Sequence, residues 1–287
     1  MGQVIQMADY FTPDAEQFVG TAAAHTIGLM IGNINGMVRL ILDIPEKYNA
    51  LGIISSRTGT VAQAIAIDDA VKACNAKLLR FEMAIDAGRQ CGQGCLFILG
   101  AETISDARKV VEESLHNIDY WSQCIYINEV GHMESHVTPR AGEVLHEIFG
   151  TPVGRAFGVV GAAPAGVGIA AVDRAVKAAP VDIVWYGSPS HNLRMMNEFV
   201  AGVTGDIAAV QKAMDVGKET GCQLLTALGI TPISIQDVAE ECGEDYLKRN
   251  MSPAVCQEEK AASIHINKKC DEERYYIGRK RTWERKL

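Results

Sequence analysis

An internal duplication constrains the fold of this chain more than any other feature of its sequence. Residues 66–79 (AIDDAVKACNAKLL) and 171–184 (AVDRAVKAAPVDIV) are identical at six of 14 positions, with an offset of 105 residues. Short apolar runs, at 51–54 and 157–160, precede the two segments, and their offset differs from that of the segments by one residue. The chain has 287 residues, which is enough for two domains of ordinary size. We therefore expect two related domains in tandem.

Each copy predicts the same succession of helices and strands. A β-rich run, at 50–56 in the first copy and 155–161 in the second, leads through a glycine-containing turn into an alanine-rich helix. Two strands then bracket a polar loop, which predicts a β-hairpin, and a second helix follows. The hairpin strands are predicted at 78–83, 95–99, 183–187 and 199–203. Each copy is therefore an α+β unit, an antiparallel sheet with helices packed on it.

The two copies divide the chain into four parts. We predict an N-terminal segment, a first domain, a second domain and a polar C-terminal extension, at 1–17, 18–124, 125–230 and 231–287. The extension ends in a basic run, GRKRTWERKL, and is typical of an appendage that is either solvated or docked on a partner.

Composition and charge exclude several classes of protein. A formal net charge of −8 opposes binding to nucleic acid, because phosphate binding needs a basic face. No apolar run approaches the roughly 20 residues that cross a bilayer, and the first residues lack the pattern of a signal peptide. We therefore expect a cytoplasmic protein with no membrane or nucleic-acid partner, whose eight cysteines are reduced thiols.

A glycine-rich segment in the second copy suggests an alternative function. Residues 158–168 (GVVGAAPAGVG) follow a predicted strand and open a helix, as a dinucleotide-binding loop does. The glycine spacing fits neither that motif nor a P-loop, since Val167 stands where a P-loop has lysine. A nucleotide-binding α/β enzyme remains one alternative, and a sensor with its small-molecule ligand between the repeats is another. The enzyme hypothesis does not explain the duplication. The sensor hypothesis predicts a discrete globular protein that does not assemble into sheets.

Two further groups of residues have simple structural interpretations. His132 and His136 flank Glu134 at a spacing that could hold a metal, but the segment begins as a strand, which favours packing or surface histidines. Cys91 and Cys95 lie in a polar loop whose glycines predict an exposed turn. A closed metal site needs four ligands, and nothing adjacent to the two cysteines supplies the others.

The duplicated helix carries one ion-pair pattern twice. Asp68–Lys72 and Asp173–Lys177 are spaced i, i+4, which is typical of an ion pair on a helix surface. Retention of the pattern in both copies suggests a further role. The sequence contains no Ser-His-Asp grouping, no nucleophile elbow and no recognisable pair of catalytic carboxylates, so we expect no enzyme.

Longer phrases around the duplicated helices carry a family resemblance. The run LGIISSRTGTVAQAIAIDDAVKACNAKLL and its echo FGVVGAAPAGVGIAAVDRAVKAAPVDIV resemble the bacterial microcompartment (BMC) shell domain. The phrases FVGTAAAHTIGLMIGNI, INEVGHMESHVTPRAGEVL and GTPVGRAFGVV are most similar to the propanediol-utilisation shell protein B group and its ethanol-utilisation relatives. The resemblance implies two tandem, circularly permuted BMC domains with ferredoxin-like layering.

The resemblance also implies a function and an assembly. Three chains would form a disc with pseudo-sixfold symmetry, and discs would tile with other shell proteins into the envelope of a microcompartment in the cytoplasm. The chain would be a structural protein with no catalytic activity and no cofactor. Small polar metabolites would pass through its pores. The extension at 231–287 lies beyond the resemblance, and its basic end would either stay solvated or contact encapsulated enzymes or another shell protein.

Several residues match positions with a role in single-domain relatives. There the helix lysine lies at the tile edge and a Pro-Arg pair supplies an edge arginine, which implies these roles for Lys72, Lys177 and Arg140. The first copy has no Pro-Arg pair within 25–33, which implies that one edge is held differently. The hairpin loop lines the pore in those relatives, and it is longer here in both copies. The implied pore-lining residues are Asp86, Arg89, Gln90, Cys91, Gln93, His191, Asn192, Arg194 and Asn197.

Cys91 has a second interpretation. Some trimeric relatives hold an iron–sulfur cluster on the axis through one pore-loop cysteine per chain, and Cys91 stands where three thiolates could meet. Gln90 and Gly92 form no recognised cluster motif around it, so a small pore residue is the alternative.

Overall fold

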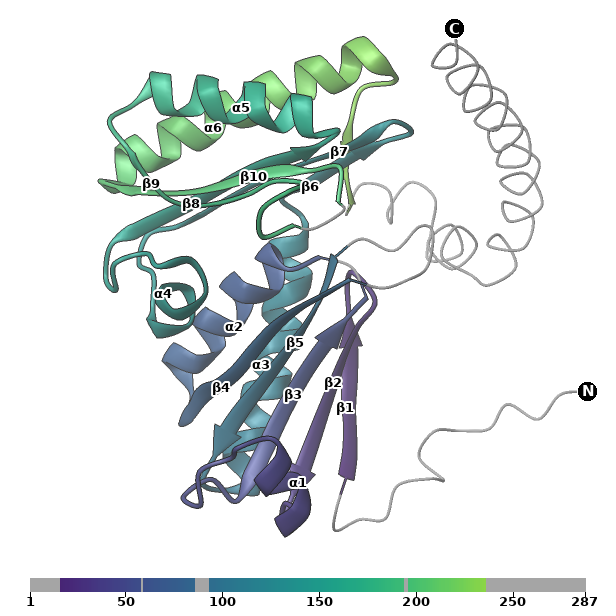
Figure 1. Cartoon of the computed structure of the whole chain (residues 1–287), viewed down its shortest axis with the longest axis vertical. Coiled ribbons are helices and arrows are strands. Elements are labelled where there is room, and N and C mark those ends of the chain that lie inside the picture. The colour runs from purple at the N-terminus through teal and green to yellow at the C-terminus, as the bar shows by residue number, and fades with distance from the viewer. Residues whose placement is uncertain (1–15, 58, 86–92, 194–195, 236–287) are drawn as a thin grey trace, which may run out of the picture. The chain divides into compact units, whose positions relative to one another are not determined.

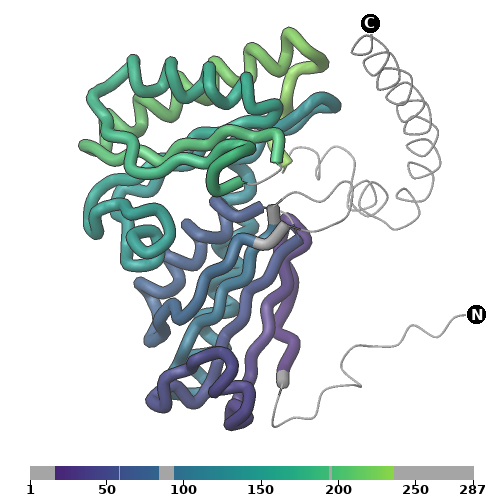
Figure 2. Tube along the Cα trace, in the orientation of Figure 1, coloured from purple at the N-terminus to yellow at the C-terminus, as the bar shows by residue number. Residues whose placement is uncertain are grey.

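The described part of the chain forms two antiparallel sheets with helices packed on them. The structure is a computed structural model that describes residues 16–57, 59–85, 93–193 and 196–235. Each sheet is built from one copy of the duplicated sequence (Figure 1). The trace in Figure 2 completes the first sheet before it enters the second. The predicted α+β class is therefore confirmed.

The first sheet contains the strands of the first copy in the order β1-β2-β3-β5-β4. These strands are β1 (Glu16–Ala22), β2 (Thr26–Gly32), β3 (Ala50–Ser56), β4 (Ala76–Ile85) and β5 (Gln93–Ala101). Helix α1 (Gly36–Ile41) joins β2 to β3, α2 (Val61–Ala73) joins β3 to β4, and α3 (Ile104–Ser122) follows β5. Strands β4 and β5 form the hairpin that the sequence predicts.

The second sheet repeats this order and adds one short strand, giving β11-β6-β7-β8-β10-β9. Its strands are β6 (Ile125–Asn128), β7 (Gly131–Thr138), β8 (Ala156–Ala163), β9 (Asp182–Gly187), β10 (Phe199–Gly205) and β11 (Ile233–Ser234). Helices α4 (Glu143–Phe149), α5 (Ala165–Ala178) and α6 (Ile207–Leu228) take the places of α1, α2 and α3. Within the described residues, none of the helices combines the length and apolarity needed to cross a membrane.

Glycines at matching positions let one helix of each copy lie close to its sheet. A Cβ atom on Gly52 of β3 would lie 2.8 Å from a methyl carbon of Val111 on α3. In the second copy, a Cβ atom on Gly158 of β8 would lie 2.7 Å from Val210 on α6. Close packing of helix on sheet therefore requires glycine at both positions. Because Gly52 and Gly158 both allow the covering helix to approach the sheet, we treat them as equivalent positions when the two copies are compared.

The two sheets share a hydrophobic core through α2 and α4. Helices α5 and α6 cover one face of the second sheet, while α4 lies on the opposite side of this sheet and contacts α2 of the first copy (Figure 1). Phe149 at the end of α4 stacks on Phe157 of β8, with ring centroids 5.4 Å apart. Ile65 of α2 and Leu145 of α4 belong to the same buried cluster. The core that holds the two copies together is therefore apolar and continuous.

Candidate functional site

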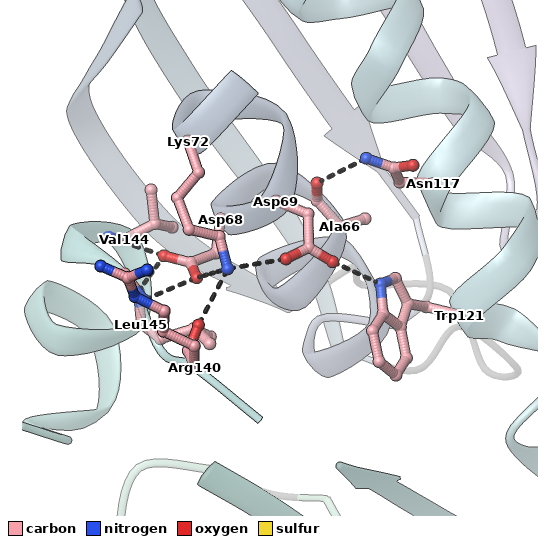
Figure 3. Close-up of polar contacts among 10 residues, drawn as sticks. Ala66, Asp68, Asp69, Lys72, Asn117, Trp121, Arg140, Val144 and Leu145 are labelled. Atoms are coloured by element: carbon pink, nitrogen blue, oxygen red, sulfur yellow. Dashed lines mark hydrogen bonds and ion pairs between the residues drawn. The ribbon is translucent and has the colours of Figure 1, made fainter. Parts of the chain in front are cut away.

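A single carboxylate on α2 caps a helix of the other copy. Asp68 accepts hydrogen bonds from the backbone N–H groups of Gly142, Val144 and Leu145, at N···O distances of 2.7, 3.1 and 3.2 Å (Figure 3). The residue before α4 is Gly142, which has no side chain to cap its own helix. Asp68 is 1% exposed. The prediction that Asp68 is on a solvent-exposed helix surface is therefore wrong, because its carboxylate is buried against the start of α4.

Lys72 connects the same carboxylate to the segment before α4. Its Nζ lies 3.1 Å from Asp68 Oδ2 and 2.7 Å from Asp69 Oδ1, and it donates a 2.9 Å hydrogen bond to the backbone oxygen of Arg140. Burial lowers the pKa of Lys72, but hydrogen bonds and charges from Asp69 and Asp68 outweigh burial and raise this pKa above 10.5. Two of the three predicted edge residues, Lys72 and Arg140, therefore meet within one chain.

The second ion pair of the duplicated pattern is solvent-exposed. Lys177 Nζ lies 2.7 Å from Asp173 Oδ2, and both side chains are more than half exposed. The predicted helix-surface ion pair is confirmed for this copy. The same two residue types thus form a buried helix cap on α2 and an exposed pair on α5, and only their neighbours differ.

The two copies can be compared residue by residue through their strand pairing. Met30 of β2 lies opposite Gly52, and Val137 of β7 lies opposite Gly158, so Met30 and Val137 are equivalent. The same register makes Met37 equivalent to Val144. It also aligns Asp43 with Gly150, and both have positive φ, 54° and 68°, just after α1 and α4.

This register reveals two exposed faces that match a buried contact. Met37 on α1 is 69% exposed, whereas its equivalent on α4, Val144, is 1% exposed because it packs against α2. Leu40 and Ile41 extend the exposed apolar face of α1. On α5, the equivalent of α2, Ile169 is exposed, whereas the alanine at its place on α2, Ala64, is fully buried. Within one chain, α4 is therefore buried against α2, whereas the equivalent helices of the other copies, α1 and α5, are both exposed.

The predicted pore residues fall partly outside the described structure. Asp86, Arg89, Gln90, Cys91 and Arg194 lie outside the described residues, and the side chain of Gln93, at the start of β5, is not described.

The described members of the second loop lie near the end of β9 and the start of α5. The ring of His191 stacks on Tyr186 with centroids 4.6 Å apart, and Asn192 Nδ2 donates a 2.8 Å hydrogen bond to the backbone oxygen of Tyr186. Asn197 accepts a 3.2 Å hydrogen bond from the backbone N–H of Ala165. His191 and Asn192 are thus brought together on one turn.

The glycine-rich segment and the thiol of Cys95 serve packing. A Cβ atom on Gly168 would lie 2.3 Å from the backbone oxygen of Phe199, so this glycine allows α5 to approach β10. Cys95 is buried in β5, its Sγ lies 3.0 Å from Ser56 Oγ, and burial raises its pKa to about 12. The strand predicted at 95–99 is therefore confirmed at Cys95, which lies in the sheet and not in an exposed turn.

Both histidines of the HMESH segment pair with carboxylates on or near β7. His132 Nε2 lies 2.9 Å from Glu198 Oε1, and His136 Nε2 lies 3.2 Å from Glu134 Oε2. Among the described residues there is no group of three or more metal-ligating side chains arranged to hold an ion. The sequence shows Glu134 between the two histidines but does not show that it pairs with His136, and Glu198, the partner of His132, lies 66 residues further along the chain.

The comparisons with known proteins agree with the duplicated fold. Residues 156–233 match the BMC domain family. The bacterial microcompartment shell protein PduB of Citrobacter freundii is 38% identical over 216 residues, which cover 75% of this chain and 80% of the relative. The crystal structure of EtuB from Clostridium kluyveri is 37% identical, covers 76% of this chain and 96% of that chain, and has a TM-score of 0.73.

A crystal structure described as a trimeric bacterial microcompartment shell protein PduB is 34% identical and has a TM-score of 0.71. It covers 76% of this chain and 96% of that chain. The class that the fold and these matches define is a shell protein built from two BMC domains in tandem. Within that class, the chain belongs to the PduB family of bacterial microcompartment shell proteins. Neither the nucleotide-binding enzyme nor the two-domain sensor is supported.

Proposed function

We propose that this chain is a structural tile of a bacterial microcompartment shell and that it assembles as a homotrimer with pseudo-sixfold symmetry. The observation that carries the proposal is the pair of exposed faces on α1 and α5. They are the register equivalents of α4 and α2, which bury Val144 and Asp68 against each other within one chain. If α1 of one copy docks on α5 of the next, three chains close a ring of six equivalent contacts.

The residues on both faces fit this docking. Met37, Leu40 and Ile41 present an apolar surface from α1, and Ile169 offers an apolar partner on α5. Asp173 stands where Asp68 stands on α2, so it would accept hydrogen bonds from the start of α1 in the neighbouring copy. Asn35 already caps α1 within its own chain by accepting from the N–H of Met37 at 2.9 Å. Helix α1 is therefore formed before it meets a partner.

Light scattering on gel-filtered protein tests this assembly. Three chains of 31.0 kDa give 93 kDa. We expect that mass for the natural sequence and the mass of one chain for the double variant Met37→Glu, Ile41→Glu, with unchanged far-UV circular dichroism. Leu228→Glu is the matched control, because Leu228 is also an exposed apolar residue of a helix. A natural chain that stays monomeric at all concentrations, or a double variant that stays trimeric, would contradict the proposal.

Tile edges and pores complete the proposed function. Lys72, Lys177 and Arg140 are all partly or fully exposed, which supports a role at contacts with neighbouring tiles and other shell proteins. In the first copy, Asn33 stands at the register position of Arg140, so the two kinds of edge would be held differently. The tile would sit in the shell within the cytoplasm. It would act without cofactor and without catalysis.

The long hairpin loops would line passages for small polar metabolites. Their polar side chains can replace part of a solute's hydration without binding it tightly, which conduction requires. The extension at 231–287 would contact encapsulated enzymes or other shell proteins. Replacing Arg89 and Arg194 by alanine should change the permeation of charged solutes through reconstituted shells and leave the trimer mass unchanged. Loss of the trimer would instead identify the loops as structural.

A further inference from the structure

An ion pair joins the second hairpin loop to strand β7. His132 lies at the start of β7, and its Nε2 lies 2.9 Å from Oε1 of Glu198, the residue before β10. Strand β8 runs between β7 and β10 and places Ala163 opposite His132. Because alanine has only a methyl side chain, the imidazole can reach across β8 to the carboxylate. The Glu198 side chain is mostly buried, and the His132 side chain is partly exposed.

The described residues of this loop are attached to the sheet on both sides of the loop. Leu193 is buried in the hydrophobic core, and a Cβ atom on Gly187 would lie 2.6 Å from Cγ of Leu193, so this side chain lies directly against the end of β9. On the other side, Glu198 supplies the ion pair, and Asn197 accepts a hydrogen bond from the first residue of α5. The attachment at Leu193 is apolar and does not titrate, whereas the attachment at Glu198 depends on the charge of His132.

The charged groups around the imidazole keep it protonated. Burial lowers the pKa of His132, but the hydrogen bond and charge of Glu198, together with the charge of Glu134, outweigh burial and raise this pKa above 6.5. The neighbouring strands place Ile127 of β6 and an alanine of β8 opposite His132, and neither of these side chains ionises. Further along β7, His136 pairs with Glu134 at 3.2 Å. His132 is therefore the member of this row that connects β7 to the loop.

The first copy has the histidine but lacks the ion pair. In the register of the two sheets, His25 stands at the place of His132, and Gly94, which has no side chain, stands at the place of Glu198. Burial and the positive charge of Arg57 lower the pKa of His25. The histidine of the first copy is thus kept neutral, and that of the second copy is kept charged.

The neighbouring positions on the strand differ in the same way. Leu29 stands at the place of His136, and Ile27 stands at the place of Glu134. The fold therefore forms with apolar residues at these positions. Because burial of imidazole and carboxylate groups costs free energy, packing alone does not account for the ionic row of the second copy.

We propose that the His132–Glu198 ion pair positions the second hairpin loop, and that the loop loosens when the imidazolium loses its proton. While His132 is charged, residues 196–198 are held on β7. Once it is neutral, the mostly buried carboxylate of Glu198 loses its counter-charge, and its solvation by water then favours release of these residues. The loop of the first copy has no such pair, so three of the six loops in a trimer would respond to pH. An effect on solute passage rests on the pore function proposed above.

Hydrogen exchange of the full chain, followed by mass spectrometry, tests the attachment. Overlapping peptic peptides resolve residues 196–199, and their exchange is corrected for the intrinsic pH dependence of amide exchange. For the natural sequence we expect protection of these amides to fall at least about fivefold between pH 6 and pH 9. Protection that stays constant over this range would overturn the proposal.

Two variants and a matched control assign the change to the ion pair. His132→Gln keeps a hydrogen-bond donor without a charge, and Glu198→Gln removes the counter-charge. We expect residues 196–199 to exchange fast at both pH values in each variant, so one variant remains if the other fails to fold. His25→Gln, the equivalent change in the first copy, should leave the fivefold fall intact. A fall of the same size in His132→Gln and Glu198→Gln would refute the role of the pair.

Permeation separates this inference from the proposed pore function. Glycerol is a suitable probe, because its own charge does not change between pH 6 and pH 9. We expect its passage through reconstituted shells to depend on pH for the natural sequence and not for His132→Gln. If hydrogen exchange responds as expected and passage does not, the attachment stands and the loop does not line the pore. If hydrogen exchange does not respond, the inference fails whatever the loop lines.

Discussion

The carboxylate of Asp68 lies 2.7 Å from the backbone nitrogen of Gly142, and this contact ties the first copy of the fold to the second. A helix cap is usually supplied by the residue just before the helix. Here it comes from 74 residues earlier in the chain. The start of α4 is thereby fixed on α2, and the same geometry, repeated between chains, is the basis of the proposed ring.

Replacing Asp68 by alanine should destabilise the chain strongly. Three backbone N–H groups would lose their acceptor in a buried position, and Lys72 would lose one of its two carboxylate partners. We expect the free energy of unfolding to fall by about 2–4 kcal/mol, measured by urea denaturation at fixed protein concentration. Asp68→Asn should lose less of the free energy of unfolding, because the amide oxygen of asparagine can still accept hydrogen bonds from the backbone N–H groups at the start of α4.

The matched control is Asp173→Ala on the equivalent helix. Its carboxylate is exposed within one chain, so folding of the monomer should change by less than about 0.5 kcal/mol. Under the proposed assembly, the same variant should lower the fraction of trimer at low concentration. If Asp68→Ala and Asp173→Ala lowered the free energy of unfolding equally, the cap on α4 would not be a source of stability for the folded chain.

Gly142 should not tolerate a side chain. A Cβ atom there would lie 2.6 Å from Asp68 Oδ1, so Gly142→Ala must push the carboxylate away from the start of α4. We expect a loss of about 1–3 kcal/mol in the free energy of unfolding. Gly36→Ala is the control, because a Cβ atom at Gly36 meets nothing within 4 Å and Glu143 occupies the equivalent position. Since alanine favours a helix more than glycine does, similar losses in both variants would argue against displacement of the Asp68 carboxylate as the cause.

The order of strands and helices was predictable because its signals are local. The alanine-rich helix and the hairpin strands follow from the spacing of apolar residues within short windows. The predicted strands at 78–83 and 95–99, for example, fall within β4 and β5, whose observed ends extend further. Duplication added the rest, because a pattern that recurs at a constant offset predicts a second domain with the same topology.

The contacts that hold the site together were not predictable in the same way. Asp68 and Lys72 show only an i, i+4 spacing, and nothing near them in the sequence indicates that the partner of the carboxylate is the backbone at Gly142. A helix that begins after a glycine, with no capping side chain of its own, was the one available signal. His136 could have been found by comparing the copies, since leucine stands at its place in the first one.

The edge residues can be tested separately from the trimer. Lys72→Ala, Lys177→Ala and Arg140→Ala should each preserve the mass of 93 kDa that three chains of 31.0 kDa give, because each removes one exposed charge and leaves the apolar side chains of α1 and α5 in place. We expect fewer or smaller sheets when the concentrated proteins are imaged by electron microscopy. Lys72→Ala should also lower thermal stability slightly, since Lys72 holds the backbone of Arg140. Undiminished sheets in all three variants would place the tile edge elsewhere.

The stability of the fold should depend on pH through His136. Its pKa is about 9 in the folded chain and near 6.5 when unfolded, so the folded state binds the extra proton between these values. The stabilisation is complete below pH 6.5 and is lost as the pH rises through 9; we expect a decrease of roughly 1–3 kcal/mol.

The lowered pKa of Cys124 acts with the opposite sign, because a thiol that ionises more easily in the folded state makes stability rise with pH. The Cys124→Ala variant removes that contribution while His136 keeps Glu134. Urea denaturation of Cys124→Ala at pH 6.5 and pH 9, against the double variant Cys124→Ala, His136→Leu, isolates the imidazole. A decrease with pH that is equally steep in both proteins would show that Glu134 alone does not keep His136 protonated once the contact with Cys124 is removed.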